Sequence, residues 1–112
     1  MKPKDMCLIT EAELDEFCTY NQTEVDLYRK KFPTSFKAEH MLTWCDRIQR
    51  MKSVIQKTKK DSSLSIDEKR AKISRCLEII RIDKISIESA LDYLKYRANE
   101  ASEMFNKLCK TK

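Results

Sequence analysis

The sequence predicts an all-α protein, a four-helix bundle-like chain with long heptad-patterned helices that self-associates. Apolar residues recur at steps of three and four in several stretches, as on one face of a helix. Glycine is absent and proline occurs only at Pro3 and Pro33, so breaks between helices must be few. The apolar fraction of 41% and charged fraction of 37% are typical of helices with long solvated faces. We expect one helical domain over residues 1–112, with residues 1–9 as a loose N-terminal segment.

The clearest pattern lies near the C-terminus. Apolar or small residues alternate steps of four and three there: Ile87, Leu91, Leu94, Ala98, Ala101, Phe105 and Leu108. This spacing predicts an amphipathic helix roughly 33 Å long. One apolar face of that length needs a cover, either other helices or a second copy of the chain.

The N-terminal third begins with a helix start. Thr10 can cap the helix while Glu13 reaches back, which is the pattern of a capping box. We predict one helix over 11–32, ended by Pro33, because proline disfavours helical angles in the preceding residue. The alternative is a break at 20–23, where Thr23 and Asp26 would start a second helix.

Asn21 belongs to the same question. In a continuous helix it is a polar residue at an apolar slot, of the kind that fixes register and copy number. With a break at 20–23 it is a surface residue at the end of a helix.

Two further helices are expected before the C-terminal one. The second covers about 35–59 and carries a clear apolar face: Met41, Trp44, Ile48, Met51 and Ile55. The third follows a second capping box at Ser65 and Glu68, and Ile79 and Ile82 broaden its apolar arc. We therefore expect the third helix to be the most buried. The segment 83–86 is predicted as a short junction, with a simple kink as the alternative.

The predicted helices differ in length, which favours association. Three of them have about 22–25 residues and the third about 17, so longer helices must overhang a shorter one. An overhanging helix keeps its apolar face exposed. We therefore expect a homo-oligomer, with a dimer favoured, or a partner protein helix.

The candidate partner-binding residues lie on the last helix, opposite its main apolar face: Tyr93, Tyr96, Arg97 and Met104. Tyrosine, arginine and methionine are enriched in the cores of protein interfaces. Burial of both faces of a central helix is the alternative. The small residues Ala98 and Ala101 allow close helix approach, although tapering of the core beside Trp44 is the favoured interpretation.

Charge is distributed unevenly along the chain. Residues 27–60 hold ten basic and two acidic residues, whereas residues 1–26 hold two basic and seven acidic. We expect these parts to attract each other or a partner. The alternative function is nucleic-acid binding (RNA or DNA) by a helical dimer through phosphate contacts from Arg47, Arg50, Lys57 and Lys60.

No catalytic residue, metal site or cofactor is predicted. His40, the only histidine, has no further ligand at suitable spacing and is expected to pack beside Trp44. The five cysteines lack metal-ligand spacing and are expected to be reduced, most of them in apolar surroundings. No apolar run or signal-peptide core predicts membrane insertion, so we expect a cytoplasmic or nuclear protein. The sequence thus favours a non-enzymatic helical protein-interaction module.

Overall fold

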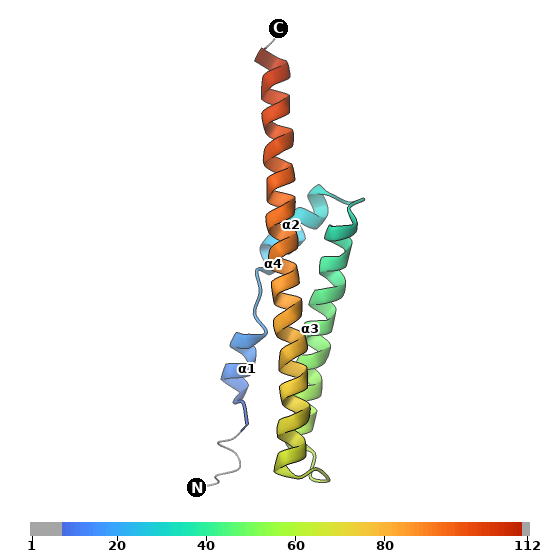
Figure 1. Ribbon diagram of the computed structural model, residues 1–112, viewed down its shortest axis with the longest axis vertical. Helices are drawn as coiled ribbons and strands as arrows, with labels where there is room; N and C mark the ends of the chain where they lie inside the picture. The colour runs from blue at the N-terminus through green and yellow to red at the C-terminus, as the bar shows by residue number, and fades with distance from the viewer. Residues whose placement is uncertain (1–7, 111–112) are drawn as a thin grey trace.

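The computed structural model describes residues 8–110, and within them every regular element is a helix. Figure 1 shows the four helices: α1 (Glu11–Phe17), α2 (Gln22–Lys31), α3 (Phe36–Lys60) and α4 (Ile66–Lys110). The molecule measures 73 × 24 × 16 Å, since α4 alone has 45 residues. The predicted all-α class is confirmed.

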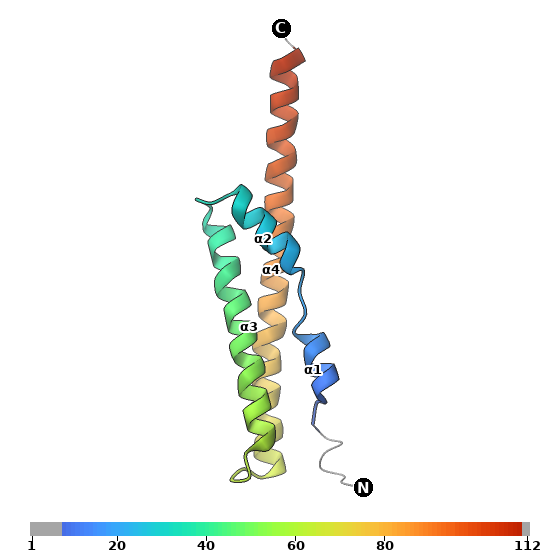
Figure 2. The same ribbon diagram turned by 180° about the vertical axis from the view of Figure 1, so that it is seen from behind.

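An antiparallel pair of long helices, α3 and α4, forms the body of the fold (Figures 1 and 2). Ser35 caps α3 by accepting a hydrogen bond from the Ala38 amide. At the start of α4 the predicted capping box is present, with Ser65 and Glu68 bonding each other's backbone amides at 3.1 and 2.8 Å. These caps satisfy amides that the first turn of a helix leaves unpaired, so the two helices begin where the sequence predicts.

The prediction of one helix over 11–32 is wrong, because the helix is interrupted between α1 and α2. Thr10 and Glu13 make the expected capping box, but α1 ends at Phe17. Asn21 then caps α2, its side chain accepting a hydrogen bond from the Glu24 amide at 3.0 Å. An asparagine side chain that replaces the backbone acceptor favours a helix start over a helix interior. Asn21 is therefore the exposed residue at a break, as the alternative predicts.

The predicted junction at 83–86 is absent, and the third and fourth predicted helices are one continuous α4. No proline or glycine interrupts this segment. Instead of capping a new helix, the Ser86 hydroxyl donates to the Ile82 carbonyl of the preceding turn at 3.0 Å. Asp83 points into the interior and is fully buried. A polar residue that finds a partner within or across the helices does not need to end one.

Opposite charges join α1 to the α3–α4 pair. Lys52 and Lys59 of α3 pair with Asp15 and Glu11 of α1 at 2.7 and 3.5 Å. The predicted attraction between the acidic start and the basic middle is therefore present within one copy. Lys84 of α4 adds an anchor, because its ammonium donates to the Phe17 carbonyl at the end of α1 at 2.8 Å.

The core lies between α3 and α4 and is closed on one side by α1 and α2. Its fully buried large side chains include residues from all four helices: Leu14, Val25, Met41, Ile48, Ile55, Ile80, Ile87 and Leu94. Leu8 and Ile9 pack partly buried against it. The rest of the predicted loose N-terminal segment, residues 1–7, lies outside the described residues.

Two finer expectations about the architecture are not met in the described part of the chain. One long helix pair carries two short helices, so a bundle of four comparable helices is not shown. The predicted third helix, expected to be the most buried, leaves part of its wide apolar arc open, because Ile82 is 48% exposed. The other three helices of residues 8–110 leave one side of α4 open to solvent (Figures 1 and 2).

Helix α4 extends well beyond its neighbours. Lys37, in the first turn of α3, lies over the Tyr93 ring at 5.1 Å, and Glu24 of α2 pairs with Lys95 at 3.0 Å. The part of α4 that follows these contacts, about 96–110, is the red end in Figure 1. At 1.5 Å per residue this overhang is about 22 Å long.

Candidate functional site

The overhang of α4 continues the face on which α3 packs. Residues about 18 apart lie five helical turns apart and point in the same direction. Ile80, Asp83, Ile87 and Ala90 are buried, and five turns later come Ala98, Ala101, Phe105 and Leu108. We call these last four residues together with Met104 the overhang face. Its residues are of the types that are usually buried, but α3 does not extend along this part of α4.

The overhang face is solvent-exposed at its large side chains. Met104, Phe105 and Leu108 are exposed by 62%, 65% and 67%. Ala101 is exposed as well, so tapering of the core beside Trp44 does not explain it. The polar residues of this stretch lie on the other sides of the helix: Asn99, Glu103, Asn106 and Lys107. The overhang is therefore an amphipathic helix whose apolar side lacks a cover within the described chain.

Contrary to expectation, the four predicted partner-binding residues do not lie directly opposite this face: Met104 belongs to it and the other three lie along its flank. Tyr93, Arg97 and Met104 follow one row at steps of four and seven, and Tyr96 lies beside that row. Glu100 links two of them, because it accepts hydrogen bonds from the Tyr96 hydroxyl at 3.4 Å and from Arg97 at 2.8 Å. Tyr93 and Tyr96 are 44% and 62% exposed. The row forms a polar-edged border to the overhang face.

The structure adds a second exposed apolar row that the sequence pattern did not reveal. Ile82 and Ile85 are 48% and 54% exposed, and by the helical repeat they share the outer side of α4 with Tyr96. The sequence-based prediction placed Ile82 in the core because it assumed cover on all sides. The spacing 82, 85, 89, 93, 96 indicates that these positions share one side of a helix. It does not show on which side of that helix α3 packs.

The predicted phosphate-binding residues are divided by the fold. Arg50, Lys57 and Lys60 are exposed on α3, and within residues 8–110 no ion pair engages them. Arg47 instead turns towards α4 and binds Asp83 with two hydrogen bonds, at 2.8 Å from Nε and 2.6 Å from Nη2. Three of the four residues therefore remain available on one surface.

The Arg47–Asp83 pair is a partly buried charged contact between the two long helices. The Asp83 side chain is 0% exposed and that of Arg47 is 42% exposed. The hydrogen bonds to Asp83 raise the pKa of Arg47 above its ordinary value. Spacing along the chain could not predict this pair, because its members are separated by 36 positions and Asp83 stood in a predicted junction.

Among the described residues, His40 packs against an aromatic ring and three of the four cysteines are buried. The His40 and Trp44 rings lie 5.9 Å apart, which confirms the expected packing. Cys18, Cys45 and Cys76 are buried free thiols, whereas Cys109 is exposed. Burial raises the pKa of Cys45 and raises that of the neighbouring Tyr20 to about 12. Among the described residues no group of three or more His, Cys, Asp or Glu side chains is arranged to hold a metal ion.

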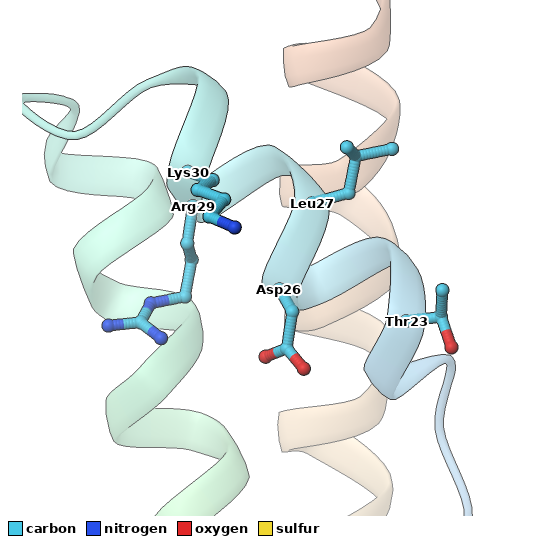
Figure 3. Close-up of a pocket in the computed structure, with 5 residues that line it drawn as sticks. All are labelled: Thr23, Asp26, Leu27, Arg29 and Lys30. Carbon is cyan, nitrogen blue, oxygen red and sulfur yellow. The ribbon is translucent and has the colours of Figure 1, made fainter.

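Surface hollows offer little for a small ligand. The hollow in Figure 3 is lined by a single helix, α2, through Thr23, Asp26, Leu27, Arg29 and Lys30. The side chains in that view diverge and do not converge on one point. Another hollow, between α4 and the segment joining α1 to α2, is crossed by the Glu24–Lys95 ion pair. Neither gathers polar groups around a buried centre.

No protein family model, curated protein or solved structure matches this chain. Its surfaces are therefore the source of functional information. Within residues 8–110, no helix is both long and apolar enough to cross a membrane. In the same part of the chain, the overhang face of α4 is a run of apolar side chains without a covering helix. A surface of this kind is suited to packing against another helix.

Proposed function

We propose that this chain is a non-enzymatic helical interaction module that associates with itself or with a partner helix through the uncovered surface of α4. The observation that carries the proposal is the continuation of the α3-packing face about four turns beyond α3. Met104, Phe105 and Leu108 remain about two-thirds exposed there. Exposed contiguous apolar side chains with a polar border are typical of protein interaction sites.

The energetics favour a weak, concentration-dependent complex. Complete burial of a large apolar side chain contributes roughly 1.5–3 kcal/mol. Six such side chains, three from each of two copies, would contribute about 6–12 kcal/mol after allowance for the part already buried. Association costs about 4–15 kcal/mol in lost freedom of motion. The two figures are of similar size, so we expect dissociation constants in the micromolar range or weaker.

Sedimentation equilibrium of the Phe105→Ser variant tests the proposal. The wild-type mass should rise towards that of a dimer with concentration, whereas the variant should stay monomeric at concentrations roughly tenfold higher. Ile82→Ser is the matched control, because it also removes an exposed apolar side chain from α4 but lies on the outer side. Its association should remain like that of the wild type, and circular dichroism should show equal helix content in all three proteins.

Tyr96→Ala extends the test to a partner of another kind. The proposal is abandoned if the wild type is a strict monomer at high concentration and neither Phe105→Ser nor Tyr96→Ala changes what the chain captures from a cell extract. Loss of one captured protein with both variants, but not with Ile82→Ser, would identify that protein as the candidate partner.

Nucleic-acid binding is the second candidate function. It is supported by the exposure of Arg50, Lys57 and Lys60 on α3 without ion-pair partners in the described chain. Such a ridge would contact phosphates and read backbone shape more than base sequence. Fluorescence anisotropy with short RNA and DNA duplexes should then show affinity falling with salt, at a log–log slope near −0.9 per phosphate contacted on duplex DNA.

The control for nucleic-acid binding uses a cation that α1 already occupies. Lys52 and Lys59 are paired with Asp15 and Glu11, so Lys52→Ala should leave the salt slope unchanged while Lys57→Ala lowers it by about one. An anisotropy that stays constant at low salt with both duplexes and single strands would end this candidate.

A further inference from the structure

We infer that the helix covering the overhang face is the overhang of a second copy of this chain, packed antiparallel about a two-fold axis that crosses the contact at the height of residue 103. This inference rests on the proposed function and names the partner and its orientation. The space to be filled lies on the α3 side of α4, beyond the contact of Lys37 with Tyr93. In Figures 1 and 2 no other helix of the described chain lies beside this end of α4.

The position of α3 excludes the parallel arrangement. Both views show α4 as a long rod with α3 along one side of it. By the five-turn repeat, the overhang face points to that same side. Two parallel copies in contact through their overhangs would need both α3 helices in the space between the two α4 rods. Packed helix axes lie only about 8–10 Å apart, so that space does not exist. In the antiparallel arrangement each body extends away from the contact.

Side-chain size selects the register. With the two-fold axis at the height of residue 103, Ala98 lies opposite the partner's Leu108, and Ala101 lies opposite the partner's Phe105. Each large exposed residue thereby meets a small one, and the two-fold axis repeats both pairs. Interdigitation of large and small side chains allows close packing without voids. The chain supplies both halves of this match within residues 98–108.

The ends of the interface also fit. The partner's α4 would run in the same direction as α3 and finish close to its first residue, Phe36, which is 78% exposed. The C-terminus of one helix would then face the N-terminus of another, which is the favourable order of helix dipoles. Ser102 and Met104 flank the axis, so no like charges are forced together at the centre.

Disulfide trapping of the full chain tests the orientation. Ala98→Cys and Leu108→Cys are made separately, with Cys7 and Cys109 replaced by serine and an affinity tag on one of the two proteins. In the antiparallel dimer the two copies of residue 98 are about 15 Å apart, measured along the helix direction. A disulfide needs Cα atoms within about 7 Å. Neither variant alone should cross-link, whereas an equimolar mixture should give a tagged–untagged dimer under mild oxidation.

The other outcomes separate this inference from the proposed function. Cross-linking of Ala98→Cys with itself would show a parallel contact and overturn the inference, although self-association would stand. Self-association in the ultracentrifuge without any cross-link in the mixture would overturn the register that places Ala98 opposite Leu108. A strict monomer would overturn the second copy as partner, while the capture experiments with Phe105→Ser and Tyr96→Ala still decide whether another protein binds.

Discussion

Arg47→Met is expected to lower the free energy of unfolding by about 3–5 kcal/mol. The variant removes the guanidinium that makes two hydrogen bonds to Asp83 and leaves that carboxylate with its 0% exposed side chain between two helices. An isolated buried charge is far more costly than a paired one, because nothing replaces its lost hydration. Urea unfolding followed by circular dichroism measures the difference directly.

Removal of the other member of the pair should lower the free energy of unfolding by less. Asp83→Ala leaves Arg47 without that carboxylate, but the arginine side chain is 42% exposed and can turn its charge towards water. The Arg47→Met/Asp83→Leu double variant should regain most of the loss, since a well-packed apolar pair can replace a buried ion pair. Arg50→Met is the matched control, and a shift there beyond about 0.5 kcal/mol would contradict the assignment of the effect to the buried pair.

The same pair has a consequence for the interaction surface. Arg47 and Asp83 lie on α3 and α4, so their contact reinforces the alignment that the short connection between Lys60 and Ile66 gives the two helices. A slip of one heptad would change the overhang by about 10 Å. Apolar side chains alone specify register weakly, whereas a bidentate ion pair adds geometric specificity and favours one alignment. The contact therefore supports the alignment that leaves the overhang face exposed.

Ile80→Ala is expected to cost about 2–5 kcal/mol of stability, whereas Ile82→Ala should change it by less than about 0.5 kcal/mol. The two isoleucines are two residues apart on α4, but Ile80 is 0% exposed and Ile82 is 48% exposed. Truncation at Ile80 removes buried methyl groups and leaves a cavity between α3 and α4. At Ile82 the lost contact is small, and alanine has the higher helix propensity.

Thermal and urea unfolding of both alanine variants tests this difference. Similar losses at the two positions would show that the outer side of α4 is covered in solution. A concentration-dependent loss for Ile82→Ala would assign that cover to another copy of the chain and would move the contact surface from the overhang face to the outer side. The comparison therefore also checks which apolar row of α4 takes part in association.

Local chemistry in the sequence determined most helix ends. Thr10 with Glu13 and Ser65 with Glu68 form capping boxes because each pair lies within one turn of the chain. Pro33 ends the helix before it for a reason that needs no distant partner. The all-α class and the mostly buried cysteines also follow from composition and spacing. Asn21 shows the limit of such local signals, since its capping role and a register role fit the same sequence.

Only the tertiary structure decided which faces are covered and which contacts hold them. A run of apolar residues at steps of three and four shows that a helix has an apolar side, but Ile80 and Ile82 differ only through the position of α3. From the sequence, Asp83 is a residue expected to end a helix. In the fold, Arg47, 36 positions earlier, lies beside it and neutralises its charge, so the helix continues. The overhang face was expected from unequal helix lengths. Which residues of α4 form it is known only from the pairing of α3 with α4. Packing and charge neutralisation depend on distances in space between residues that are far apart in the sequence, and spacing along the chain does not give those distances.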